Sequence, residues 1–236
     1  ALAARHGLAL TAVDLRGHGR SRGERSYVER FDDYLLDVDA LWEQAGARFA
    51  GLPRFLMGHS MGGAIALAWA ARHQPAAAGV VLSSAALKIG GDVPRLLVAL
   101  APLLSRWLPR LRGTRIDPSL ISRDPAAVAA YVGDPLVSLA APPARTGAEL
   151  LAVMAQSTAA AAGLALPVYL FHGSEDRLTD PAGSREVHAA WGGADKTLRL
   201  WPGSRHETLN DLDREAVAAE LMAWLEARCG AIAGAR

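Results

Sequence analysis

A serine between two glycines is the residue of this sequence best suited to chemistry. The segment FLMGHSMGGAIALAWAARHQP, residues 55–75, contains Ser60 in a Gly-x-Ser-x-Gly pentapeptide. This pattern is typical of a nucleophile elbow, a sharp strand-to-helix turn that exposes the serine hydroxyl. An apolar run precedes Gly58 and a helical pattern follows Gly62, and glycines at these positions remove Cβ atoms that would otherwise collide. We therefore predict that Ser60 is a nucleophile.

Two later loops could supply the base and the acid that a serine nucleophile needs. Asp176 follows the apolar run PVYLFHG, and His206 follows TLRLWPG, so each comes directly after a predicted strand. Ligands of open α/β sheets bind at the carboxyl ends of the strands, and we expect both loops to meet Ser60 there. Glu175 and Asp180 flank Asp176 and are alternative candidates for the acid.

The other histidines are expected to lie outside the catalytic group. His172 ends an apolar run and is predicted to be a packed structural histidine. His59 lies inside the elbow, so its side chain should point away from the base. Structural or solvated roles are expected for His6, His18, His73 and His188. No cluster of His, Cys and Asp has metal-ligand spacing, so we expect neither a metal nor a cofactor.

The composition restricts the class of protein. The chain has 236 residues, of which 51% are hydrophobic, and a formal net charge of +1. This is enough for one sizeable core, and it lacks the basic excess of a nucleic-acid-binding protein. The single cysteine, Cys229, excludes an internal disulfide and suits a reducing, cytoplasmic compartment. No apolar run reaches the ~18 residues of a membrane span, and no signal peptide is recognisable.

Short apolar runs alternate with longer amphipathic patterns, which predicts an α/β fold with parallel strands joined by crossover helices. Strands are expected over residues 8–13, 54–57, 78–82, 168–171 and 197–201, and helices over 31–49, 61–73 and 216–227. Residues 87–166 break this rhythm with eight prolines between short helical patterns. We interpret 87–166 as a helical cap inserted into a core made of residues 1–86 and 167–236.

The predicted cap carries apolar residues at helix-like spacing, although its prolines should interrupt any single long helix. Four of them are candidates for binding an apolar substrate, namely Leu97, Leu100, Leu104 and Trp107. Basic side chains surround this stripe, a combination that suits a lid touching an anionic membrane surface and admitting an acyl chain. The alternative is an apolar face that packs on the core beneath solvated arginines.

These motifs together resemble a known enzyme family. GHGRSRGER, GHSMGG, SRDPAAVAAYVGDPLV, FHGSEDRLTDP and SRHETLND resemble the monoacylglycerol lipase and lysophospholipase group of α/β-hydrolases, also called serine aminopeptidase-like. The resemblance runs nearly end to end. It implies an α/β-hydrolase fold, with a mostly parallel sheet, flanking helices and a cap inserted after the sixth strand. It also implies Ser60 as nucleophile, Asp176 as acid, His206 as base and the backbone N–H of Met61 as an oxyanion donor.

The implied activity is cleavage of monoacylglycerol-like esters to fatty acid and glycerol through an acyl-enzyme. Lysophospholipase and general carboxylesterase activities are alternatives within the same class. The sequence begins at Ala1, without the three strands and the His-Gly loop, which carries a second oxyanion donor, of the family pattern. A non-catalytic ligand-binding module or an inactive fragment is therefore the alternative from another class. We expect a lipid ester as the small-molecule partner, no nucleic acid, and contact of the cap with membranes; the oligomeric state is left open.

Overall fold

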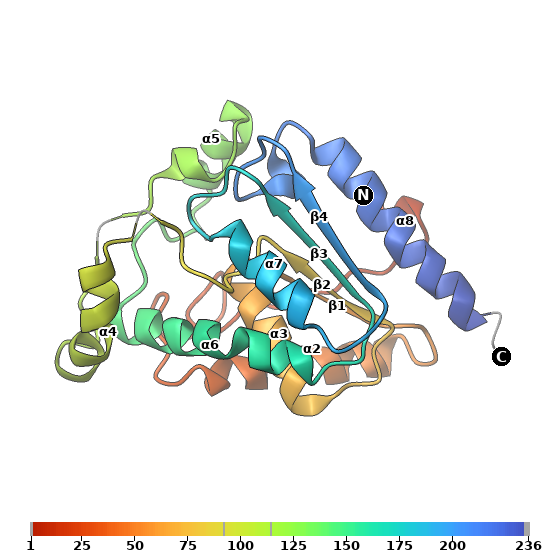
Figure 1. Ribbon diagram of the computed structural model, residues 1–236, viewed down its shortest axis with the longest axis horizontal. Coiled ribbons are helices and arrows are strands. Elements are labelled where there is room, and N and C mark those ends of the chain that lie inside the picture. The colour runs from red at the N-terminus through yellow and green to blue at the C-terminus, as the bar shows by residue number, and fades with distance from the viewer. Residues whose placement is uncertain (1, 92, 114, 234–236) are drawn as a thin grey trace.

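The computed structural model describes residues 2–91, 93–113 and 115–233, and its centre is one parallel sheet (Figure 1). Four strands lie in the order β1-β2-β3-β4, with bounds Phe55–His59, Gly79–Ser83, Val168–Gly173 and Lys196–Trp201. Phe55 pairs with Gly79, and Val168 pairs with both Val80 and Lys196. Parallel neighbours require crossover connections, which the helices between the strands provide.

Helices cover both faces of this sheet (Figure 1). On one face, β2 directs Val80 and Leu82 into a core shared with α2 (Asp32–Arg48), α3 (Met61–His73), α6 (Ala144–Ala162) and α7 (Pro181–Ala190). On the other face, Val81 packs with Trp224 of α8 (Arg214–Ala233). A short helix, α1 (Leu2–Arg5), begins the described chain. Side chains alternate between the faces of a strand, so a continuous apolar run such as β2 is buried on both sides.

Asp-Pro pairs start three of the helical segments. The side chains of Asp117, Asp124 and Asp180 each accept a hydrogen bond from the backbone N–H two residues later. The following proline stands at the first helical position, where its missing N–H has no cost. These aspartate N-caps mark the first residues of η1 (Pro118–Leu120), α5 (Pro125–Gly133) and α7, and therefore fix where the preceding loops end.

The segment between β2 and β3 contains α4 (Arg95–Trp107), η1, α5 and α6. In Figure 1, α5 lies beyond the arrowheads of β3 and β4, at the carboxyl edge of the sheet. The expectation that prolines interrupt any single long helix is confirmed at Pro94 and Pro109, between which α4 begins and ends, but is wrong at Pro102, through which α4 continues. An exposed helix accommodates one proline by giving up a single backbone hydrogen bond. The division of the chain into core and cap at residues 87 and 166 stays a prediction.

The four later strands and the three helices predicted from the sequence are confirmed, with α8 longer than expected. The strand predicted over residues 8–13 is wrong, because this segment forms no secondary structure, and Leu10 is 79% exposed. Apolar composition alone does not make a strand, since its backbone groups need a partner. In the described part of the chain no strand pairs with the outer edge of β1, where Met57 is 41% exposed.

Candidate active site

Ser60 occupies a strained turn between β1 and α3. Its backbone angles are φ 54° and ψ −123°, a region that residues other than glycine rarely adopt. Two strong backbone bonds hold it there: the N–H of Ser60 donates to the carbonyl of Ser83 at 3.0 Å, and the N–H of Ala86 donates to the carbonyl of Ser60 at 2.8 Å. The end of β2 therefore imposes the geometry that the elbow motif predicts.

The glycines of the motif are not equivalent. A Cβ at Gly58 would lie 2.2 Å from the carbonyl oxygen of Gly62, so this glycine is required for the close approach of β1 and α3. A Cβ at Gly62 would meet no atom within 4 Å outside its own helix, so the predicted steric need at this position is wrong. The position that does require glycine is Gly63, because α3 packs closely on the segment after β2 and a Cβ there would lie 2.4 Å from that of Ala85.

Asp176 and His206 come together as predicted. The Nδ1 of His206 lies 2.7 Å from Oδ2 of Asp176, and both side chains are buried. Because an ionised carboxylate only accepts hydrogen bonds, Nδ1 carries the proton and Nε2 keeps its lone pair. Of the alternative acids, Glu175 is exposed and Asp180 caps α7. Asp176 is therefore the carboxylate that orients His206.

Asp176 is the centre of a dense hydrogen-bond network. Its Oδ2 also accepts from Nε2 of His172 at 3.0 Å and from Oγ1 of Thr179 at 2.8 Å. Its Oδ1 accepts from the N–H groups of Leu178 and Thr179. Burial would raise the pKa of Asp176, but the hydrogen bonds from His172 and His206 outweigh burial and hold this pKa well below its usual range. Asp176 is consequently charged throughout the range in which histidine titrates.

His172 is buried as predicted, but sequence reasoning missed its contact with the acid. Its Nδ1 lies 2.8 Å from the hydroxyl of Ser184, so each ring nitrogen has a partner. The spacing of four residues between His172 and Asp176, across the end of β3, is the sequence signal that could have found it. The remaining histidines have partners elsewhere, which are Glu226 for His6, the carbonyl of Arg16 for His18, Asp39 and Trp69 for His73, and the carbonyl of Lys196 for His188.

His59 was expected to point away from the base, and this expectation is wrong. The centroids of the His59 and His206 rings are 4.8 Å apart, and Nε2 of His59 lies 3.3 Å from Oε1 of Glu207. The expectation rested on the place of His59 inside the elbow, but the loop after β4 brings both His206 and Glu207 against this side chain. Burial would raise the pKa of Glu207, but its contact with His59 outweighs burial and lowers this pKa to about 2. A second histidine–carboxylate pair thus lies against the first.

The contact between serine and histidine is not formed in this structure. Within the described residues the hydroxyl of Ser60 has no hydrogen-bond partner. The ring of His206 nevertheless packs against the ring of His59, the residue directly before Ser60. Catalytic hydrogen bonds in unliganded sites are often long and tighten when a substrate binds. In this structure the acid and the base are thus already hydrogen-bonded beside the elbow, and only the bond between Ser60 and His206 remains to form.

The four candidate substrate residues of the predicted cap lie on α4. Leu97, Leu100 and Trp107 are exposed, with Trp107 at 68%, while Leu104 is half-buried. A separate apolar cleft of about 320 Å³ opens between α2, α3 and α6. Its lining includes Ala86, whose N–H bonds the Ser60 carbonyl. A group of three or more metal-ligating side chains is not found among the described residues, nor is a helix long and apolar enough to cross a membrane.

A strained serine between strand and helix, beside an aspartate–histidine pair at the carboxyl edge of a parallel sheet, defines an α/β-hydrolase. The chain belongs to the family described as serine aminopeptidase, S33, which matches residues 2–213. This family membership confirms the resemblance seen in the sequence.

Individual relatives agree with this family. The chain is 35% identical over 219 residues to a monoacylglycerol lipase of Mycolicibacterium smegmatis, covering 93% of this chain and 78% of that protein. It is 36% identical over 223 residues to a monoglyceride lipase of Mus musculus, covering 93% and 74%. The crystal structure of a Paleococcus ferrophilus monoacylglycerol lipase matches with a TM-score of 0.87 at 31% identity, covering 96% of this chain and 88% of that one. The predicted fold class is therefore confirmed.

Proposed function

We propose that this chain is a serine hydrolase of the monoacylglycerol lipase type, which cleaves monoacylglycerol-like esters to fatty acid and glycerol. The observation that carries the proposal is the hydrogen bond of 2.7 Å between His206 and Asp176 beside the strained Ser60. It fixes the tautomer that leaves Nε2 of His206 free to take a proton. The kinship with monoacylglycerol lipases supports the substrate class.

The reaction proceeds in two halves. Oγ of Ser60 attacks the ester carbonyl while Nε2 of His206 takes the hydroxyl proton, and Asp176 stabilises the imidazolium that forms. His206 then returns this proton to the leaving glycerol oxygen, which leaves an acyl-enzyme. Water attacks the acyl carbonyl with the same proton transfers, and the fatty acid departs.

The developing oxyanion needs a donor that is already in place. Met61 is the first residue of α3, and the N–H groups of a first helical turn have no partner within their helix. We assign the N–H of Met61 to the oxyanion, aided by the positive end of the helix dipole. One such donor contributes about 10²–10³-fold to kcat in serine hydrolases.

The acyl chain requires an apolar surface. The cleft between α2, α3 and α6 offers leucine, alanine and valine side chains, and Ala64 lies one turn along α3 from Ser60. Each methylene buried there contributes about 0.8 kcal/mol, so acyl chain length is read mainly as binding affinity.

Active-site labelling tests this proposal. A fluorophosphonate should label the wild-type chain at Ser60, located by peptide mass, and Ser60→Ala should remain unlabelled. Wild-type enzyme that has not been exposed to the label is then assayed on monoacylglycerol, lysophosphatidylcholine, a short water-soluble ester and an aminoacyl amide. Preference for lysophosphatidylcholine would favour the lysophospholipase alternative, and preference for the short ester a general carboxylesterase. Absence of labelling would favour the non-catalytic module.

The exposed face of α4 is proposed to touch a membrane surface. Leu96 and Leu103 lie on this face with Leu100 and Trp107, and Arg95 and Arg106 flank it. Leu103→Glu should weaken binding to vesicles containing phosphatidylglycerol, because it places a charge in the apolar face. Leu10→Glu is the control, since Leu10 is also exposed, at 79% against 55% for Leu103, but lies outside this helix. Equal binding of both variants would contradict the proposed contact.

A further inference from the structure

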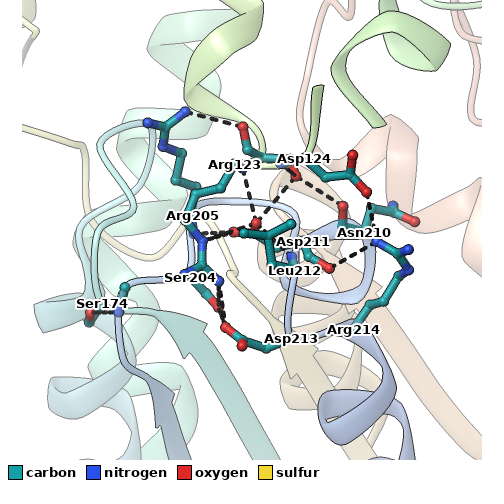
Figure 2. A network of polar contacts seen from close by, with 12 residues as sticks. Arg123, Asp124, Ser174, Ser204, Arg205, Asn210, Asp211, Leu212, Asp213 and Arg214 are labelled. Carbon is teal, nitrogen blue, oxygen red and sulfur yellow. Dashed lines mark hydrogen bonds and ion pairs between the residues drawn. The ribbon is translucent and has the colours of Figure 1, made fainter. Parts of the chain in front are cut away.

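The predicted cap and the loop that carries the base are joined by an ion pair whose carboxylate is buried. Figure 2 shows Arg123, in the segment between η1 and α5, reaching into residues 203–213, here called the His206 loop. The backbone N–H of Arg123 and its Nε donate to Asp211 at 3.0 and 3.1 Å, and the side chain of Asp211 is fully buried. Nη2 of Arg123 extends the contact to Asp213 and to the hydroxyl of Ser204 at 3.1 Å. One guanidinium thus contacts both halves of the loop.

The same network holds the two residues that flank His206. The N–H of Arg205 donates to Asp211 at 2.8 Å, and Nη1 of Arg205 donates to the carbonyls of Ser119 and Ser122. On the other side, the N–H of Glu207 donates to the carbonyl of Ile121 at 2.7 Å. His206 is therefore held from both sides by contacts that begin in residues 119–124.

The charge of this cluster favours a rigid loop. Burial would raise the pKa of Asp211, but the N–H donors of Arg205, Leu212 and Arg123 outweigh burial and lower this pKa. Asp211 is therefore ionised, and a buried carboxylate left without its cation is strongly destabilised. Moving Arg123 away from Asp211 would therefore destabilise the loop.

We propose that Arg123 is a positioning residue for catalysis, which acts through Asp211 and Asp213 to hold His206 in line with Asp176 and Ser60. This inference rests on the proposed function, because it assigns His206 as the base. It also makes residues 119–124 of the cap part of the support of the catalytic group. Displacement of this segment would then be transmitted to His206 without any direct contact.

Variants of Arg123 test this role against a matched control. Arg123→Gln removes the positive charge. Arg123→Lys keeps the charge, but its ammonium lacks the planar set of N–H donors with which a guanidinium binds Asp211 and Asp213 at once. Arg110→Gln is the control, because Arg110 also lies within the predicted cap, residues 87–166, and pairs with Glu24 in residues 1–86, but does not touch the His206 loop. Arg123→Lys keeps the test available if Arg123→Gln does not fold.

We expect Arg123→Gln and Arg123→Lys to lower kcat by about tenfold or more while KM changes less than about twofold, since a misplacement of ~1 Å can cost ~10²-fold in rate. The concentration of active sites is measured by fluorophosphonate titration of a separate sample, and kcat is calculated per titrated site, so that unfolded protein does not lower the measured kcat. Arg110→Gln should retain the wild-type kcat within about twofold. Arg123→Ala should regain activity with millimolar guanidinium but not with ammonium, because the site is partly open to solvent.

Three results would overturn the inference: a wild-type kcat per titrated site in the Arg123 variants, an equal loss in Arg110→Gln, or no rescue by guanidinium. A wild-type chain that the fluorophosphonate does not label would instead refute the proposed function, and this inference with it. The labelling control therefore separates the two failures.

Discussion

Alanine at Gly62 should stabilise the protein, whereas alanine at Gly58 should disable it, although the elbow motif contains both glycines. At Gly62 a Cβ would meet no atom within 4 Å outside its own helix. Gly62 lies in α3, where alanine is favoured over glycine by about 0.5–1 kcal/mol. In a chain of this size ~1 kcal/mol raises Tm by about 2–4 °C, so Gly62→Ala should raise it by about 1–4 °C.

At Gly58 the same methyl group would lie 2.2 Å from the carbonyl oxygen of Gly62. Carbon and oxygen atoms normally approach to about 3.3 Å, so β1 and α3 would have to separate by about 1 Å. Overpacking of this kind costs about 1–3 kcal/mol, which lowers Tm by about 2–12 °C. Ser60 lies between the two elements, and its reactivity should fall by ~10²-fold. Gly63→Ala should also be destabilising, because its Cβ would lie 2.4 Å from that of Ala85.

Thermal unfolding followed by circular dichroism gives Tm, and the second-order rate of fluorophosphonate labelling gives the reactivity of Ser60. Gly62→Ala serves as the control for Gly58→Ala, because both add one methyl group to the same motif. Equal losses of Tm in the two variants would refute this reasoning. So would Gly58→Ala that reacts at the wild-type rate.

Two further predictions concern the base and the acid. Burial lowers the pKa of His206, and the neighbouring charge of His59 lowers it further against the opposing effect of Asp176, so the acid limb of kcat/KM should inflect below the ~6.5 of a free imidazole. The stability that neutral His206 contributes is then complete above about pH 6.5 and is lost as the pH falls below it; an inflection above 6.5 in the pH–rate profile would contradict this. Asp176→Asn should lower steady-state kcat by about 10³–10⁴-fold, because one of the two accepting oxygens becomes an NH₂ donor. If this NH₂ faces His206, it forces the wrong tautomer; if it faces the backbone, it meets the N–H groups of Leu178 and Thr179. A loss of less than tenfold would argue against this role.

Much of the candidate site could be predicted because its signals are local. The Gly-x-Ser-x-Gly pattern, the apolar runs before Asp176 and His206, and the helix after Ser60 all depend on neighbours in the chain. The strands and helices that carry these residues have the predicted positions. Parallel strands deliver their following loops to one edge, so the order of elements was enough to bring Asp176 and His206 together.

Other features depend on partners that are distant in sequence. An apolar run over residues 8–13 predicts a strand, but a strand exists only where another backbone accepts its hydrogen bonds. The direction of His59 depends on the turn at Ser60 and on Glu207, which lies on the loop after β4. The steric need for Gly63 depends on Ala85, at the end of another strand. None of these contacts leaves a periodic pattern.

The sequence by itself determined which side chains could react and on which loops they lie, because turn chemistry and hydrophobic periodicity act over a few residues. Only the tertiary structure decided which of them meet. Arg123 and Asp211 are 88 residues apart, and although both lie in segments that resemble the family, nothing in either segment predicts their contact. Their pairing follows from where the segment between η1 and α5 lies relative to the loop after β4. Separating them would leave a buried carboxylate without its cation, which is strongly destabilising.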